Sequence, residues 1–317
     1  MLKGADANLL IIHQGALGDF ILTFPAINRL QKYYQPVDVL CQSQLGKLAG
    51  ALGLAQNWYP SEAAYVASLF GDRIDPKIKA LLAQYEHIIL FTVSDRLEQS
   101  VNRVAANASC RLPPKPPVDQ RLHVAQFVLE AVRACGLINS ADAGLDDLPL
   151  PVRQSRRRNP AKILLHPGAG SVRKRWPLSN FLQVETALKA DGLQPEFVLG
   201  PAENALAEEL LHPDRVVHVL DDLLVLLDLL DSAGGYIGND SGASHLAAYC
   251  GLPTTVIFGP TDPQRWAPIG RAVNIVRPGL PCRPCFETEP DSCNDPQCLE
   301  STGPQQVVRA FFKVYSN

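Results

Sequence analysis

Residues 9–30 read LLIIHQGALGDFILTFPAINRL, and this stretch decides the fold class. The run Leu9–His13 is short and apolar, as expected of a buried strand, and it ends at Gly15. From Asp19 onward, apolar side chains recur at the spacing of one helix face. The stretch therefore predicts a strand, a glycine turn and a helix, which is the opening unit of an α/β protein.

The same alternation continues along the first half of the chain. Apolar runs predict strands at 37–41 and 87–93, and helical spacing predicts helices at 78–85 and 123–135. Between residues 137 and 160 the pattern gives way to Asp, Gly, Pro and Arg, a composition typical of an exposed connection. We therefore place a domain boundary at residue 158, with domains at 1–158 and 159–317.

The alternation resumes after this boundary. We expect strands at 162–166, 196–199, 216–219, 235–238 and 254–258, and helices at 178–190, 202–211 and 223–232. Strands that alternate with helices form parallel sheets. The sequence thus predicts an α/β protein with two Rossmann-like domains that face each other across a ligand-binding cleft.

Length and composition narrow the class of protein. A chain of 317 residues is long enough for two cores, and 46% hydrophobic with 19% charged residues is typical of a globular protein. The formal net charge of −3 argues against a nucleic-acid partner. No apolar run is long enough for a transmembrane segment, and residues 1–13 do not resemble a secretory signal, so we expect a cytoplasmic protein.

The first polar loop, Gly15-Ala-Leu-Gly18-Asp19, follows the first predicted strand. Its glycines allow the backbone to approach a ligand, and Asp19 at or near a helix N-cap is favoured by the exposed amides. On the residues alone, a capping carboxylate is the commoner role for such an aspartate. The spacing is not G-x-G-x-x-G, which argues against a nicotinamide cofactor.

The second loop, HPGAGSVRKRWP at residues 166–177, follows the first strand of the second half. Gly168, Gly170 and Ser171 offer backbone and hydroxyl donors, and Lys174 offers a cation for phosphate oxygens. The loop is therefore either an anion site or a solvated basic loop before a helix. We expect Trp176 to anchor packing.

The third loop, GNDSGASHLAAYCG at residues 238–251, joins a strand to a helix. Its Ser and Gly residues at a helix N-terminus present free amides of the kind that hold phosphates. Asp240 would repel a diphosphate unless it caps the helix or bonds to a ligand hydroxyl or a neutral donor, so we expect it to position rather than to transfer protons. His245 is either a ligand contact or a helix residue bonded within the turn.

With the run Gly259-Pro-Thr-Asp-Pro263, these three loops resemble the glycosyltransferase family that contains the lipopolysaccharide heptosyltransferases, glycosyltransferase family 9. The resemblance covers nearly the whole chain. It implies a GT-B architecture, with an N-terminal domain for the acceptor, a C-terminal domain for the nucleotide sugar, and catalysis that inverts the sugar without a required metal or cofactor. It matches Asp19 to the general base and Lys174 to the cation beside the leaving diphosphate. The residues expected to bind the nucleotide sugar are Gly18, Gly168, Gly170, Ser171, Asp240, Ser241, Gly242, Ser244 and His245.

The resemblance also implies substrates. The expected donor is ADP-heptose and the expected acceptor is a lipopolysaccharide core or related surface glycolipid, at the inner face of the inner membrane. Arginines at 153 and 156–158 would assist a peripheral contact with that membrane. The alternatives are a transferase with a different nucleotide sugar, a non-catalytic nucleotide-sugar-binding protein of the same fold, and a metal or redox sensor.

The sensor alternative comes from cysteines near the C-terminus. Cys282, Cys285, Cys293 and Cys298 have the spacing C-x2-C-x7-C-x4-C. Four thiolates can hold a structural zinc ion or an iron–sulfur cluster, and free thiols or disulfides are the other interpretations. We expect this cluster to lie outside the chemical step.

Overall fold

A computed structural model describes residues 7–105, 109–145, 158–279, 282, 284–288, 293 and 297–316. The chain divides into two units, Met1–Pro149 and Leu150–Asn317. The boundary predicted at residue 158 borders residues 146–157, which lie outside the described part.

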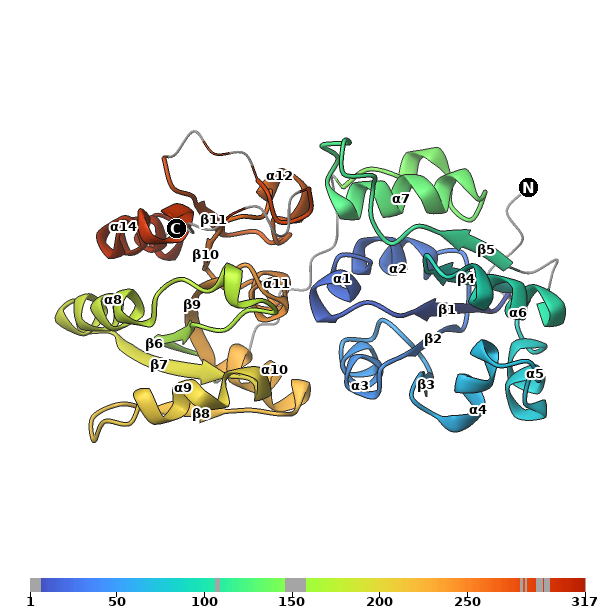
Figure 1. Cartoon of the computed structure of the whole chain (residues 1–317), viewed down its shortest axis with the longest axis horizontal. Helices are drawn as coiled ribbons and strands as arrows, with labels where there is room; N and C mark the ends of the chain where they lie inside the picture. Colours follow the sequence, from blue (N-terminus) through green and yellow to red (C-terminus); the bar gives the residue numbers. More distant parts are fainter. Residues whose placement is uncertain are drawn as a thin grey trace. The chain divides into compact units, whose positions relative to one another are not determined.

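The first unit is built on a parallel sheet with the strand order β3-β2-β1-β4-β5 (Figure 1). From β1 the chain adds β2 and β3 on one side, and then returns to add β4 and β5 on the other. The order of the strands therefore reverses between β1 and β4. The strands are β1 (Leu9–His13), β2 (Val37–Cys41), β3 (Trp58–Pro60), β4 (His87–Phe91) and β5 (Ser109–Leu112).

Helices cover this sheet because its strands carry apolar side chains on both faces. Leu10 and Ile12 of β1 pack in one cluster with Ile78 and Leu97 from the helices, and the residues between them are buried as well. Cys110 and Cys135 form a disulfide between β5 and the end of α7. The helices are α1 (Leu17–Ile21), α2 (Phe24–Leu30), α3 (Ser43–Ala51), α4 (Ala64–Ala67), α5 (Pro76–Leu82), α6 (Asp95–Ala105) and α7 (Val124–Ala134), with short 3-10 turns η1 (Ser68–Phe70) and η2 (Ser140–Asp142).

The first helix begins at Leu17, close to the start predicted near Asp19. It ends at Ile21, however, and a second helix begins at Phe24, whereas the sequence predicted one helix. Pro25 lies in the first turn of that second helix. Because proline has no N–H to bond to the carbonyl four residues earlier, it favours the start of a new helix over the continuation of the first.

The second unit has a parallel sheet with the strand order β11-β10-β9-β6-β7-β8. Here β6, β7 and β8 run outward on one side, and β9, β10 and β11 run outward on the other. The reversal lies between β6 and β9. The strands are β6 (Asn159–His166), β7 (Gln194–Leu199), β8 (Val217–Val219), β9 (Ala233–Asn239), β10 (Thr254–Ile257) and β11 (Val273–Val276).

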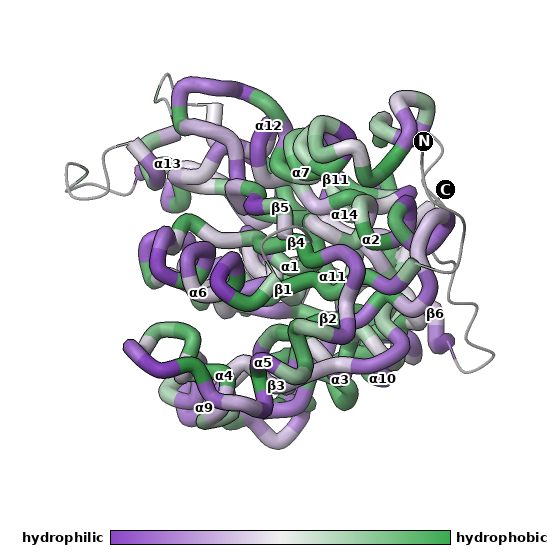
Figure 2. Tube along the Cα trace, turned by 90° about the vertical axis from the view of Figure 1, so that its right-hand side faces the viewer, coloured by the Kyte–Doolittle hydropathy of each residue, from purple (hydrophilic) through white to green (hydrophobic). Residues whose placement is uncertain are grey.

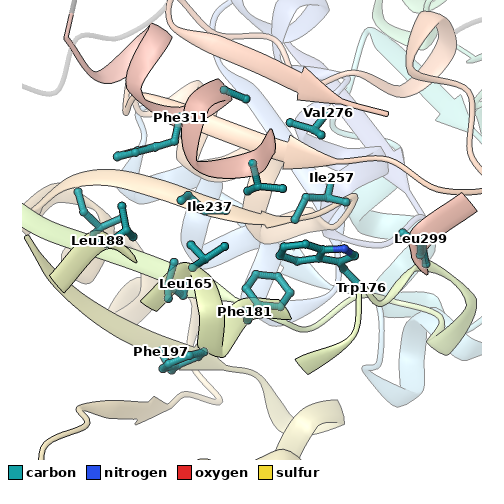
Figure 3. Close-up of a cluster of buried hydrophobic side chains, with 14 of the residues drawn as sticks. Leu165, Trp176, Phe181, Leu188, Phe197, Ile237, Ile257, Val276, Leu299 and Phe311 are labelled. Atoms are coloured by element: carbon teal, nitrogen blue, oxygen red, sulfur yellow. The ribbon is translucent and has the colours of Figure 1, made fainter. Parts of the chain in front are cut away.

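The core of this unit lies where helices α8 and α14 pack against the sheet (Figure 3). Trp176 is 1% exposed, and its ring meets Phe181 edge to face at 5.0 Å, so it anchors packing as predicted. The helices are α8 (Leu178–Ala190), α9 (Asn204–Glu209), α10 (Leu223–Ser232), α11 (Gly242–Tyr249), α12 (Pro263–Trp266), α13 (Gln297–Glu300) and α14 (Pro304–Tyr315), with 3-10 turns η3 (Val172–Lys174) and η4 (Pro201–Glu203).

Hydropathy follows this layering. In the first unit the central strand β1 is hydrophobic, whereas α6 is largely hydrophilic (Figure 2). Within the described ranges, every helix is too short or too polar to cross a bilayer.

Candidate functional site

In the second unit, the two loops predicted to bind a ligand meet at the strand-order reversal. His166 at the end of β6 is in register with Gly238 near the end of β9. The chain leaves these two strands in opposite directions, and open α/β sheets bind ligands in the crevice that this leaves at the carboxyl edge. Loop 167–177 and the turn at 239–242 therefore share one edge of the sheet.

Asn239 joins these two loops. Its side-chain amide donates to the carbonyl oxygens of Pro167 (2.8 Å) and Gly168 (3.3 Å), and its side-chain oxygen accepts from the backbone amide of Trp176 (3.1 Å). Asn239 is fully buried. The sequence placed it in the third loop, but nothing in that pattern assigned it the role of linking the two loops.

Lys174 and Asp240 form an ion pair across the two loops, with Nζ and Oδ2 2.9 Å apart. The Thr261 hydroxyl donates to the same carboxylate oxygen at 2.7 Å. The Lys174 side chain is 20% exposed and that of Asp240 is 6% exposed, so the ammonium is the more accessible member of the pair. The Thr261 hydroxyl is a neutral donor of the kind expected for a carboxylate beside an anion site, whereas the ion pair with Lys174 was not predicted.

The N-terminus of α11 is capped by Ser241, whose hydroxyl accepts from the Ser244 amide at 3.4 Å. Ser241 and Gly242 are partly exposed. Ser244 is fully buried, and its hydroxyl donates to the Asn239 carbonyl; His245 is 3% exposed. The predicted roles of these four residues in binding a nucleotide sugar stay predictions.

The loop after β6 packs against the buried side chains of His166 and Glu203. A side chain on Gly168 would lie 2.5 Å from Glu203, whereas one on Gly170 would meet nothing within 4 Å. Glu203 pairs with Arg175 at 3.0 Å. Ser171 caps η3 by accepting from the Arg173 amide at 3.3 Å. Arg175 is therefore held by a buried carboxylate, although its own side chain is 24% exposed, while the backbone at Gly170 is open.

In the first unit, the first polar loop, Gly15–Asp19, follows β1 at the point where the strand order reverses. The Gly15 amide donates to Nδ1 of His13 at 3.2 Å, and the Ala16 amide donates to the Asp19 carboxylate at 3.1 Å. Asp19 therefore lies inside the first turn of α1 and not at the N-cap, because its carboxylate bonds back to the N-cap amide of Ala16. It remains partly exposed, and Gly18 beside it is partly exposed as well.

His13 is a buried residue that supports this loop. It is 1% exposed and contacts the ring of Phe20 at a centroid distance of 5.0 Å. Burial lowers the pKa of His13 to about 4, so the imidazole is neutral and can accept the Gly15 hydrogen bond.

Among the described residues, the clustered cysteines influence one another's pKa values but do not form a metal-binding group. Burial, followed by the charge of Cys293, raises the pKa of the Cys285 thiol; burial, followed by the charges of Cys285 and Cys293, raises that of Cys298. Cys293 and Cys298 also help to line a cavity of about 350 Å³. Across the described residues, however, no three His, Cys, Asp or Glu side chains are arranged to hold a metal ion, Cys282 included.

Comparison with known proteins finds a family whose model matches the part of the chain that holds the second and third loops. A family model described as glycosyltransferase family 9 (heptosyltransferase) matches residues 140–293. Lipooligosaccharide heptosyltransferase 2 of Campylobacter jejuni is 30% identical over 193 residues, which cover 53% of this chain and 57% of that protein. The chain spans about half the length of the curated relatives it matches. The resemblance indicated by the three loops is thereby confirmed.

Solved structures share the fold. The ADP-heptose heptosyltransferase II of Escherichia coli has a TM-score of 0.76 at 17% identity, and the match covers 98% of each chain. The dodecameric iron-containing heptosyltransferase TibC of enterotoxigenic E. coli has a TM-score of 0.64 at 17% identity, covering 99% of this chain and 78% of that one. These likenesses, together with the two parallel sheets, confirm the GT-B fold class.

Proposed function

Since the chain is a relative of glycosyltransferase family 9, we propose that it is an inverting glycosyltransferase that moves a heptose from ADP-heptose onto a lipopolysaccharide core or related surface glycolipid. The observation that carries the proposal is the placement of Lys174, Asp240 and the capped start of α11 at one strand-order reversal. A cation and free amides at such a position suit a nucleotide diphosphate.

In the proposed reaction, the second unit holds the donor. An ammonium group has three N–H donors, and Asp240 accepts from one of them, which leaves donors for phosphate oxygens. The amides of Ser241 and Gly242 supply further donors at the helix N-terminus. Fixed donors of this kind stabilise the charge that develops on the leaving diphosphate, so the proposed chemistry requires no metal or cofactor.

The first unit supplies the base. Asp19 is partly exposed at the carboxyl edge of its sheet, where its carboxylate would accept the proton of the attacking acceptor hydroxyl. A positioned base of this kind accelerates a reaction about 100- to 10,000-fold. Attack on the face opposite the leaving diphosphate inverts the anomeric carbon.

The proposed acceptor is a glycolipid at the inner face of the inner membrane. The names of the relatives, which are lipopolysaccharide and lipooligosaccharide heptosyltransferases, support the class of acceptor, and the membrane face stays a prediction. Arg153, Arg156 and Arg157, which the sequence suggested for membrane contact, lie outside the described residues, and Arg158 borders them.

The test is nucleotide-sugar binding and transfer by the wild type, Lys174→Ala and Asp19→Asn. We expect selective binding of ADP-heptose that weakens at least tenfold in Lys174→Ala, the size of one lost charge-assisted contact. Asp19→Asn should bind the donor normally and lose at least 100-fold in transfer. Selective binding of another donor would redirect the proposal to a different nucleotide sugar, and donor binding without transfer to any acceptor would indicate a non-catalytic binding protein.

A structural metal at Cys282, Cys285, Cys293 and Cys298 stays a prediction, since the described side chains do not form a metal-binding group. Iron and zinc are the metals to measure: four thiolates suit either metal, and one protein of similar fold contains iron. If the prediction holds, freshly purified protein contains about one metal site per chain, and Cys282→Ser loses it. If the wild-type protein contains no metal and its thiols react with a thiol reagent, the metal prediction is wrong and these cysteines are free thiols.

A further inference from the structure

A short segment, Cys285–Glu287, is fastened beside the proposed donor site. The amides of Cys285 and Phe286 both donate to the Pro260 carbonyl, at 2.9 and 3.0 Å. The Glu287 carboxylate accepts from Arg265 (3.0 Å) and from the indole of Trp266 (2.9 Å). Arg265 is 3% exposed, so this end of the segment is tied to a buried group. Bonds on both sides of Phe286 therefore hold the backbone from which its ring projects.

The Phe286 ring faces the two cations of η3. Nζ of Lys174 lies 4.7 Å from the ring centroid and Cζ of Arg173 lies 5.6 Å from it. Both distances fall within the range of cation–π attraction. Lys174 thus has Asp240 and Phe286 as neighbours from two different parts of the chain.

Phe286 lies apart from the buried cluster around Trp176 and Phe181. Among the described residues, it is neither a member of that cluster nor one of the hydrophobic side chains packed against it. A lysine side chain is flexible, and an ion pair alone restrains its charged end in only one direction. An aromatic ring on a different segment of the chain further restricts the positions that the Lys174 ammonium can take.

We propose that Phe286 is a positioning residue of the donor site, whose ring holds the Lys174 ammonium where it meets the diphosphate of a nucleotide sugar. The proposal rests on the proposed function of Lys174. It assigns a role to the segment around Cys285 that depends on neither a metal nor a disulfide. Loss of the ring should weaken diphosphate binding and leaving-group stabilisation, while the fold is kept.

The test combines one readout of position with one of function in Phe286→Leu and Phe286→Tyr. For position, lysines are labelled by reductive ¹³C-methylation, and the Lys174 signal is assigned by its absence in Lys174→Arg. Ring current should displace that signal in the wild type and in Phe286→Tyr, and the displacement should vanish in Phe286→Leu. Phe70→Leu, the same substitution at an exposed site of the first unit, is the matched control.

For function, the probes are ADP affinity and the rate constant for transfer from the donor. We expect about tenfold weaker ADP binding and about tenfold lower kcat in Phe286→Leu, recovery to within about threefold in Phe286→Tyr, and no change in Phe70→Leu. An undisplaced Lys174 signal in the wild type, or wild-type affinity and kcat in Phe286→Leu, would overturn the positioning role. If the wild type neither binds ADP nor transfers sugar, the proposed function fails, and the ring-current shift still reports separately whether the contact exists.

Discussion

At the scale of single residues, His13 links the shape of the Asp19 loop to pH. Its Nδ1 accepts the Gly15 amide, which requires that nitrogen to be unprotonated. Burial lowers the pKa of His13 from 6.5 to about 4. The neutral form is therefore favoured in the fold, so the stabilisation is complete above pH 6.5 and is lost as the pH falls toward 4.

The predicted size follows from that shift. Between pH 7 and pH 5 we expect His13 to account for a loss of about 2 kcal/mol in the free energy of unfolding. His13→Asn keeps an acceptor near the Gly15 amide but does not titrate, so the stability gap between wild type and variant should shrink by about this amount over the interval. Urea titrations at the two pH values measure it. His212→Asn, at an exposed histidine, is the control, and an equal change in both variants would contradict the assignment.

At the scale of elements, the loop from β6 to α8 contains two glycines with opposite tolerance to a side chain. A methyl group at Gly168 would lie 2.5 Å from Glu203 and 2.7 Å from His166, both buried, whereas the position at Gly170 is open. We predict that Gly168→Ala lowers the free energy of unfolding by about 1–3 kcal/mol and weakens ADP binding, because the loop must move to relieve the overlap. Thermal unfolding and calorimetric titration measure the two effects.

Gly170→Ala is the matched control, since it makes the same chemical change two residues away. It should leave the stability within about 0.5 kcal/mol of the wild type. Equal destabilisation by the two substitutions would mean that chain flexibility, and not the contact with Glu203, decides the role of Gly168.

The elements that the sequence predicted well are those whose side chains repeat with a clear period. Val37–Cys41 and Leu178–Ala190 match their predictions because the strand is buried throughout and the helix keeps one apolar face. The edge strands Ser109–Leu112 and Val273–Val276 were missed. Most of their residues are only partly buried, so their apolar pattern is weak.

The candidate site also contains features that the sequence predicts and features that it does not. The three loops could be recognised because Gly and Ser gather directly after apolar strands, and ligand edges of parallel sheets lie there. The contacts between residues of different loops could not be predicted. Lys174 meets Asp240 and Phe286 across long stretches of sequence, and Asn239 bonds to a loop more than 60 residues away. Such contacts follow from strand order, which local patterns do not encode.

At the scale of the whole molecule, each unit has its own sheet and carries a different part of the proposed chemistry. The donor residues that we propose all lie in Leu150–Asn317 except Gly18, and the proposed base lies in Met1–Pro149. Helix α14 packs on α8, β10 and β11 of the second unit, so the end of the chain completes that unit's core. A unit with its own sheet and core can fold by itself.

We therefore predict that residues 150–317, expressed alone, fold and bind ADP with a Kd within about threefold of the full chain, a difference of under 1 kcal/mol. Transfer activity should be absent, because Asp19 is missing from this fragment. Circular dichroism tests folding, and calorimetric titration with ADP tests binding. Lys174→Ala within the fragment is the control and should weaken ADP as it does in the full chain. A folded fragment that binds ADP far more weakly than the full chain would show that the first unit contributes to the donor site, and the division of roles between the units would have to be abandoned.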